Sequence, residues 1–577
     1  MPRPDGPTGL RSEEWLARTD LDGFLHRAYL KADGYTDESF AGKPLIGICN
    51  PWSDLIGCHG HFKELAEAVK RGVYQAGGFP MEFPVMPLGE SLMRPTSMLY
   101  RNLGAMEIEE CLRAYPFDGV VLLAGCDKTV PAALMGAASA DIPAILVTAG
   151  PMLDGRASGR AVGACTDCWL FHEDLRAGRI SEEEWGEIED GMCRSRGTCQ
   201  TMGTASTMAC IAEGLGMSLS GSATIPAVDS RRFAVGERSG RRIMELVAED
   251  LKPSDIMTRE AFEDAIRVLH AISGSANGVL HLLATARRAG VPLELEDFDR
   301  LGRDTPWLVN VKPAGDKLME AFCYAGGLPA VLAELEDLLH LDRPRVDRRP
   351  LRELLPPTDR TDRSVIASRK EPLSPTGGLV VLRGSLAPGG SVLKVTAADP
   401  RLMKHQGTAL VFDTLADLAS VVNDPNLDCD ENTVMVLRGG GPVGAPGMPE
   451  WGHLPIPLKL LDQGVTDLVR ISDARISGTS FGAVIVHVAP ESAVGGPLGL
   501  VRTGDQIRVD VEARTLDLLV DDDELERRRA AWTPPPPKDT RGYRALYAKH
   551  VTQADEGCDF DFLAGSSDVE RDALSFL

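Results

Sequence analysis

The stretch Gly119-Val-Val-Leu-Leu-Ala-Gly-Cys-Asp-Lys-Thr129 decides the fold class, because an apolar run passes directly into a run of polar residues. Residues 119–124 predict a fully buried strand. Pro131 suits the first turn of a following helix, and Ala144-Ile-Leu-Val-Thr148 predicts the next strand. The order strand, helix, strand favours a parallel sheet with helices on both faces.

The same pattern occurs earlier in the chain. Pro44-Leu-Ile-Gly-Ile-Cys49 predicts another buried strand, and it is followed by a helix-like stretch from Phe62 to Gln75. Gly77-Gly78 then ends that helix. The first half of the chain is therefore predicted to repeat strand and helix units around one parallel sheet.

The second half has a different character. Residues 342–378 are rich in Arg, Asp and Pro, which indicates a linker and a domain boundary. Short apolar runs beyond it predict a barrel or sandwich with a few helices attached, at 379–382, 409–412, 434–437, 483–488, 507–511 and 516–520. We predict an α/β protein with an N-terminal parallel-sheet α/β domain, 1–375, and a C-terminal β-barrel-like domain carrying helices, 376–577.

Composition excludes several classes of function. The chain has 577 residues and a formal net charge of −23, which disfavours nucleic acid and anionic membranes as partners because their charge would be repelled. No apolar run is long enough to cross a bilayer, and the N-terminus lacks a signal-peptide pattern, so we expect a cytoplasmic protein. In that compartment the 12 cysteines do not predict a disulfide framework. A small anionic substrate would need a locally positive site, which a metal could supply.

Three cysteines lie in loops next to predicted elements: Cys58 and Cys126 follow strands, and Cys199 precedes a helix-like run. Loops at the carboxyl ends of parallel strands are where ligands bind, so three thiols could converge on one cluster. Their separation matches no compact ferredoxin motif, and buried structural cysteine is the alternative for each. Cys165-Thr-Asp-Cys168 has the spacing of a chelating or redox pair, but no second pair follows, and we interpret it as structural.

Oxygen donors and hydroxyls form a second group of candidates. Glu90, Asp127 and Glu450 lie in Gly- or Pro-bounded segments and could bind magnesium, although solvated loop acids are the alternative. Residues 471–480 place hydroxyls after an apolar stretch, where they would cap a helix. Alternatively, helix N-terminal amides and a nearby metal or cluster could lower the pKa of a serine enough for it to act as a base.

These motifs together resemble one family, which contains dihydroxy-acid dehydratase, 6-phosphogluconate dehydratase and the aldonate dehydratases acting on arabinonate or xylonate. The similarity runs from about Gly42 to Ala493. Its most specific motifs are Gly125-Cys-Asp-Lys-Thr129, Gly197-Thr-Cys-Gln-Thr-Met-Gly203, Pro446-Gly-Met-Pro-Glu450 and Ser472-Asp-Ala-Arg-Ile-Ser-Gly-Thr-Ser480.

The resemblance implies two inorganic centres and a base. It implies a [2Fe-2S] cluster on three thiolates, Cys58, Cys126 and Cys199. It also implies a Mg²⁺ site formed by Glu90, Asp127, Glu450 and Lys128, the last as a carbamate. Ser477 matches the general base and Thr479 its neighbour in the substrate pocket. By this resemblance the magnesium holds the substrate carboxylate and 2-hydroxyl, Ser477 alkoxide removes the C2 proton, and the cluster iron draws off the 3-hydroxyl, which yields a 2-keto-3-deoxy acid.

Within this family, Thr129-Val-Pro-Ala132 and the tail Gln553–Phe562 are more similar to sugar-acid dehydratases, and a homodimer or homotetramer is implied. His59 departs from the family pattern, where Asn follows the first cluster cysteine, and this affects the surroundings of Cys58. Two alternatives stay open: dihydroxy-acid dehydratase of branched-chain amino-acid synthesis, and a non-catalytic iron–sulfur sensor or scaffold. The sensor does not explain why hard-metal carboxylates and Ser477 accompany the thiols.

Overall fold

The computed structural model describes residues 9–157, 159–450 and 454–565. Its N-terminal part is built on a four-stranded parallel sheet with the order β2-β1-β3-β4. The strands are β1 (Leu45–Asn50), β2 (Phe79–Pro84), β3 (Gly119–Ala124) and β4 (Ala144–Thr148). Every residue of β1, β3 and β4 is buried, as expected for a parallel sheet covered on both faces. The predicted α/β class is confirmed.

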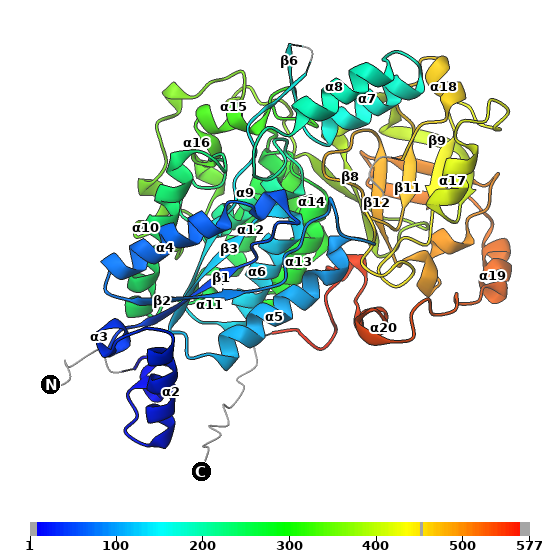
Figure 1. Cartoon of the computed structure of the whole chain (residues 1–577). Coiled ribbons are helices and arrows are strands. Elements are labelled where there is room, and N and C mark those ends of the chain that lie inside the picture. The colour runs from blue at the N-terminus through cyan, green and yellow to red at the C-terminus, as the bar shows by residue number, and fades with distance from the viewer. Residues whose placement is uncertain (1–8, 158, 451–453, 566–577) are drawn as a thin grey trace.

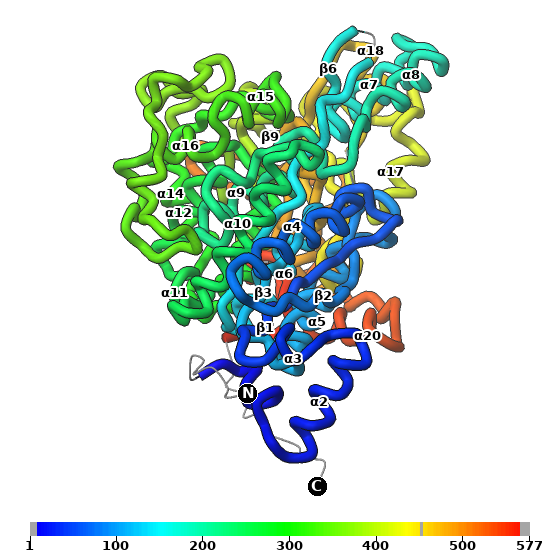
Figure 2. The backbone as a smooth tube through the Cα atoms, turned by 60° about the vertical axis from the view of Figure 1, so that its left-hand side comes forward, coloured from blue at the N-terminus to red at the C-terminus, as the bar shows by residue number. Residues whose placement is uncertain are grey.

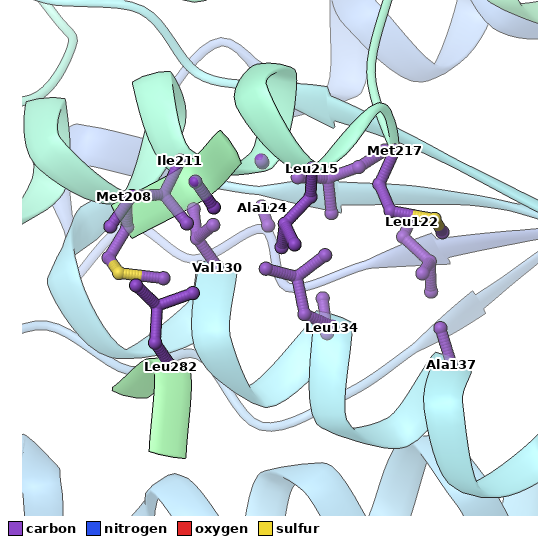
Figure 3. Close-up of a cluster of buried hydrophobic side chains, with 14 of the residues drawn as sticks. Leu122, Ala124, Val130, Leu134, Ala137, Met208, Ile211, Leu215, Met217 and Leu282 are labelled. Carbon is purple, nitrogen blue, oxygen red and sulfur yellow. The ribbon is translucent and has the colours of Figure 1, made fainter. Parts of the chain in front are cut away.

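Helices cover this sheet on both sides (Figure 1). On one face α4 (Phe62–Gln75) packs against α10 (Ser230–Glu249), and on the other α5 (Arg101–Ala114) packs against α6 (Cys126–Ala140). Two further helices, α9 (Thr204–Leu215) and α13 (Asn277–Arg288), pack on α6. Figure 3 shows aliphatic side chains of α6, such as Leu134, against Leu215 of α9 and Leu122 of β3. Burial of these apolar surfaces fixes α6 in the core.

Helix α6 begins earlier than Pro131 indicates. The prediction that Pro131 lies in the first turn is wrong, because the helix starts at Cys126 and Pro131 lies inside it. A proline here costs the hydrogen bond to the carbonyl of Asp127. Burial of every residue from Cys126 to Ser139 offsets that loss. The chemically important result is that Cys126, Asp127 and Lys128 form the first helical turn.

The C-terminal part contains an eight-stranded mixed sheet, with the order β14-β13-β9-β10-β11-β12-β8-β7. The two outer strands are linked by backbone hydrogen bonds, Leu516 N to Arg383 O at 2.8 Å and Arg383 N to Arg514 O at 3.0 Å. The predicted barrel-like architecture is therefore confirmed. The strands are β7 (Leu379–Leu382), β8 (Gly390–Lys394), β9 (Lys404–Phe412), β10 (Val434–Leu437), β11 (Arg470–Ser472), β12 (Val484–Ala489), β13 (Gln506–Asp510) and β14 (Thr515–Leu518). The sequence patterns missed β8 and β11.

The remaining elements surround these two sheets. In both overall views α2 lies at the bottom and the pair α7 and α8 at the top (Figures 1 and 2). These elements are α1 (Glu13–Leu16), α2 (Leu21–Ala32), α3 (Asp37–Phe40), β5 (Gly155–Ala157), β6 (Arg160–Val162), α7 (Thr166–Arg176), α8 (Glu182–Met192), α11 (Pro253–Ile256), α12 (Arg259–Ala271), α14 (Leu295–Asp304), α15 (Met319–Tyr324), α16 (Gly327–Glu334), α17 (Leu415–Val421), α18 (Leu458–Asp462), α19 (Asp522–Ala531) and α20 (Gly542–His550). None of the helices in the described ranges is long and apolar enough to cross a membrane.

The segment 342–378 is irregular, as the sequence indicates, but it is packed rather than free. Val365 and Ile366 are buried, and Val365 O accepts a hydrogen bond from Asn310 N at 2.8 Å. This stretch is thus held to the N-terminal part of the chain by burial and backbone hydrogen bonds. The domain division between residues 375 and 376 stays a prediction.

The C-terminal tail has a structural explanation that the sequence did not supply. Arg101 on α5 donates hydrogen bonds from its NH2 nitrogen to the carbonyl oxygens of Gly557 and Cys558, both at 2.9 Å. Arg288 on α13 forms a fully buried ion pair with Asp559 at 2.5 Å. The tail therefore fastens onto α5 and α13, beside the segment that contains Met448, whose sulfur lies 3.2 Å from that of Cys558.

Candidate active site

Three carboxylates from distant parts of the sequence meet beside the first turn of α6. One carboxylate oxygen from each of Glu90, Asp127 and Glu450 lies within 4.8 Å of the others. Glu90 follows β2, Asp127 begins α6, and Glu450 is held by a backbone bridge to Arg475. Three converging hard oxygen donors fit a magnesium ion, which prefers carboxylate oxygen. The structure thus brings together the three acids that the sequence proposed.

Lys128 lies in the same cluster and is fully buried. Its Nζ contacts Asp127 and lies 3.6 Å from Glu90 Oε2. Burial and Arg475 lower the pKa of Lys128, but the surrounding carboxylates outweigh them, so the net shift is upward. Without a metal, the lysine therefore acts as the counter-ion of the three acids.

The carboxylates differ from one another in their electrostatic environment. Burial raises the pKa of Glu450 to about 7, although the charges of Lys128 and Arg475 act in the opposite direction. Burial also opposes ionisation of Glu90, but the same two cations and hydrogen bonds from Ser97 and Thr96 lower its pKa to about 2. A bound dication would favour the ionised form of both acids.

A hydrogen-bond network that sequence reasoning missed orients Glu450. Arg475 donates to Glu450 Oε1 at 3.1 Å and to Met448 O at 2.9 Å. Asn277, the first residue of α13, donates to Glu450 Oε1 at 2.8 Å. Arg475 also donates to Thr96 Oγ1 at 3.0 Å, and Thr96 donates to Glu90 Oε1 at 2.7 Å. Arg475 lies inside the motif at 472–480, so that motif was the available signal for it.

The predicted cluster cysteines lie on three separate segments near this site. Cys58 is in a 3₁₀ turn (Gly57–His59), Cys126 is the first residue of α6, and Cys199 precedes α9. A hydrogen bond with the Cys58 thiol, together with burial, raises the pKa of Cys126. A hydrogen bond with Cys165 and burial raise the pKa of Cys199, and the charges of Cys165 and Cys58 add to this upward shift. Grouped sulfur donors are the chemistry that iron–sulfur clusters require.

Cys165 and Cys168 lie closer to this group than the sequence suggested. The thiol of Cys165 forms hydrogen bonds with Cys168 and Cys199, which lower its pKa. Cys165 is the residue before α7 and has a positive φ of 68°. The pair Cys165 and Cys168, which the sequence analysis interprets as structural, therefore lies next to the proposed cluster cysteines. Their positions in the sequence did not indicate this proximity.

His59 has a clear structural role beside Cys58. It is buried, and burial lowers its pKa to about 4, so the ring is neutral at neutral pH. Its Nε2 lies 2.8 Å from Gly125 O. Because a carbonyl oxygen can only accept a hydrogen bond, the proton of the neutral ring is assigned to Nε2. The bond ties the Cys58 turn to the residue before Cys126. The departure from the family pattern at this position therefore keeps the two segments connected.

Ser477 lies in a turn rather than at the start of a helix, so the helix-cap interpretation is wrong. Its Oγ lies 2.8 Å from Thr479 Oγ1. The chain does not continue as a helix because Ile476 O is held by Asn277 Nδ2 at 3.1 Å and β12 begins at Val484. Gly478 packs against Thr204 N, the first amide of α9. The turn thus faces the N-termini of α9 and α13, which come from elsewhere in the chain.

A pocket opens beside this turn. Ser477 and Ser480 line it together with Ser275, the last residue of β8 and the start of β12. Ser477 itself is half-buried, and Thr479 is buried. The Ser477 turn is linked to the Glu450 carboxylate through Asn277, which donates to both Ile476 O and Glu450 Oε1.

Comparison with known proteins identifies the family. Profiles of the dihydroxy-acid/6-phosphogluconate dehydratase family match residues 43–354 with the N-terminal part and 364–558 with the C-terminal part. The chain belongs to this family. It is 52% identical to L-arabinonate dehydratase of Rhizobium leguminosarum bv. trifolii over 98% of both chains. It is also 44% identical to dihydroxy-acid dehydratase of Pyrococcus abyssi (93% of this chain, 97% of the relative) and 38% identical to D-xylonate dehydratase of Caulobacter vibrioides (98% and 97%).

Proposed function

We propose that the protein is a hydro-lyase that removes water from a sugar acid, an aldonate such as L-arabinonate or D-xylonate, and releases the 2-keto-3-deoxy acid. The observation that carries this proposal is the full-length similarity to L-arabinonate dehydratase, at 52% identity over 98% of both chains. The grouping of acids, thiols and a serine hydroxyl in one region supports it, because dehydration of a 2,3-dihydroxy acid needs a base and charge stabilisation.

The proposal includes two inorganic centres. Cys58, Cys126 and Cys199 would hold a [2Fe-2S] cluster, and Glu90, Asp127, Glu450 and carbamylated Lys128 would hold Mg²⁺. The grouped thiols and the three carboxylates within 4.8 Å fit these two groups. A free ammonium cannot ligate a cation, whereas a carbamate supplies an anionic oxygen. When bound, the two centres would supply Lewis acidity toward the substrate oxygens.

The protein residues supply the proton chemistry. Ser477, as an alkoxide, accepts the C2 proton, the C2–H electron pair forms the C2–C3 double bond, and the 3-hydroxyl leaves as hydroxide. The enol then tautomerises to the 2-keto acid. Thr479 holds Ser477 Oγ in place through the 2.8 Å hydrogen bond. Asn277 contacts both Ile476 O and Glu450, so it fixes the base relative to the carboxylate cluster.

Dihydroxy-acid dehydratase activity is the second candidate, since a relative with that name is 44% identical over 93% of this chain. The two functions differ in the tail of the substrate, which is polyhydroxylated in an aldonate and apolar in 2,3-dihydroxyisovalerate. Both would use the same acids, thiols and serine, so the catalytic residues do not distinguish them.

The test is an anaerobic activity screen with protein of verified iron and magnesium content. The panel contains L-arabinonate, D-xylonate, other pentonates and hexonates, and 2,3-dihydroxyisovalerate, and the 2-keto product is measured. We expect the highest kcat/KM on an aldonate. A preference for 2,3-dihydroxyisovalerate would refute the substrate class, and full metal content without turnover on any acid would favour the non-catalytic alternative.

A further inference from the structure

Lys394 carries a buried amine that the function proposed above does not use. It is the last residue of β8, a strand that the sequence patterns did not predict. The residue as a whole is half-buried, but its Nζ is buried and has no hydrogen-bond partner among the described residues. A buried amine that lacks a partner costs free energy, so its retention needs an explanation.

Lys394 and Ser477 line the same pocket. The other lining residues come from the segment before α13, the turn after β8, the Ser477 loop and β12, and apart from Ser275 and Ser480 they are glycines or apolar residues. Apart from Lys394, the only titratable groups in this lining are serine hydroxyls. Lys394 is therefore the one lining group that can bind or release a proton near neutral pH.

Burial also sets the protonation state of this amine. Its pKa falls from 10.5 to about 7, and desolvation is the cause, since no neighbouring charge contributes. A substantial fraction is then neutral at neutral pH and able to accept a proton. An ordinary exposed lysine would be almost fully protonated and could not.

Ser477 needs such an acceptor if it is the base. The hydroxyl contacts Thr479 Oγ1, and a second hydroxyl cannot keep the serine proton at neutral pH. Among the residues that line the pocket, neutral Lys394 is the group that can take this proton. Because Lys394 Nζ has no direct partner, the connection in this conformation would run through a water molecule or a substrate hydroxyl within the shared pocket.

We propose that Lys394 is the proton acceptor for Ser477, an inference that rests on the proposed role of Ser477. The O–H bond of Ser477 breaks, an N–H bond forms on Lys394, and the resulting alkoxide takes the C2 proton of the substrate. The hydroxide released from C3 is then neutralised by the Lys394 ammonium through the pocket, which yields water. Both side chains return to their starting protonation states, so the cycle balances.

The test compares Lys394→Met with Lys404→Met. Lys404 is an exposed lysine on β9 that pairs with Asp510 at 2.9 Å, so its variant is a matched control. The measurements are iron and magnesium content, the substrate dissociation constant, and kcat from pH 5.5 to 9. We expect Lys394→Met to lose about 10²-fold or more in kcat, with metal content and substrate affinity nearly unchanged. Lys404→Met should behave as the wild type.

The pH profile separates this role from a purely structural one. Wild-type kcat should fall as the pH drops through about 7, since the amine must be neutral. This acid limb should be missing in Lys394→Met. Lys394→Ala provides a second variant, in which added ethylamine should restore part of the rate because it fills the vacated space and supplies an amine.

Three results would overturn the inference: a kcat of Lys394→Met within a few-fold of the wild type, the same acid limb in that variant, or no effect of ethylamine on a well-folded Lys394→Ala protein. If Lys394→Met does not fold, the wild-type profile and the amine experiment still decide. A wild-type protein with full metal content that dehydrates no acid in the panel would refute the proposed function itself, and with it this inference.

Discussion

Substitution of Gly478 by Ala tests how tightly the Ser477 turn is held. A Cβ at this position would lie 2.5 Å from Ser275 Oγ and 2.8 Å from Thr204 N. Thr204 begins the buried helix α9, so its amide cannot move away. Ser275 Oγ is itself held, at 2.9 Å from Thr204 Oγ1 and 3.2 Å from Asn277 N. The turn that carries Ser477 must therefore give way.

The size of the effect follows from these distances. Ordinary contacts begin near 3.4 Å, so the turn must shift by about 0.6–0.9 Å. Overpacking of this kind costs about 1–3 kcal/mol in stability. A displacement of about 1 Å at a reacting group can cost about 10²-fold in rate. We therefore expect Gly478→Ala to lose about 10²-fold in kcat while iron and magnesium content stay at the wild-type level.

The assay measures product formation together with exchange of the C2 hydrogen in deuterated solvent. Gly186→Ala is the control, because Gly186 lies on α8 and has no neighbouring atom within 4 Å of the new Cβ. That variant should keep full activity and gain slightly in helix stability, by about 0.5–1 kcal/mol. Wild-type turnover and exchange in a folded Gly478→Ala protein would contradict the idea that this turn positions the base.

Further predictions concern the two proposed centres and the tail. Anaerobically purified protein should be brown. Cys126→Ser should lose most of the colour and iron, whereas Cys165→Ser should keep both. An unchanged iron content in Cys126→Ser would contradict the cluster assignment. Chelation should abolish activity without bleaching the colour, because oxygen ligands hold magnesium and sulfur holds iron. Added magnesium should restore the activity. Activity in protein shown to be free of magnesium would exclude the metal's role. Asp559→Asn removes one of the two acidic partners of buried Arg288, while Glu109 remains at 3.2 Å, and should cost about 1.5–3 kcal/mol, measured as a lower urea midpoint. Asp413→Asn, at an exposed carboxylate, should cost under about 1 kcal/mol. Equal midpoints for the two variants would show that the tail contact contributes little.

Some elements could be predicted because local sequence determines them. The strands at 119–124 and 144–148 and the helix at 62–75 follow from apolar periodicity and from the residues that end them, and the structure confirms these bounds. The candidate residues were also available from sequence, through the motifs at 125–129, 197–203, 446–450 and 472–480. What the motifs carry is residue type and order, and these are enough to select thiols, acids and a serine.

Other features depended on contacts between distant segments. Pro131 predicted the wrong helix start, because a local preference was outweighed by burial of the whole helix. The Ser477 segment forms a turn, since Asn277 and α9 hold it from outside. The Cys165 thiol forms a hydrogen bond with Cys199. The number of residues between the two cysteines does not predict this contact.

The sequence by itself determined the fold class, the family and the identity of the candidate ligands, since these depend on patterns within short stretches. Only the tertiary structure decided the protonation and orientation of those groups. The pKa of Lys394 and that of Glu450 both shift because burial removes water from a charge, and burial is set by which distant segments pack together. That is why a lysine at the end of an unpredicted strand became a candidate partner of Ser477 only in the folded chain.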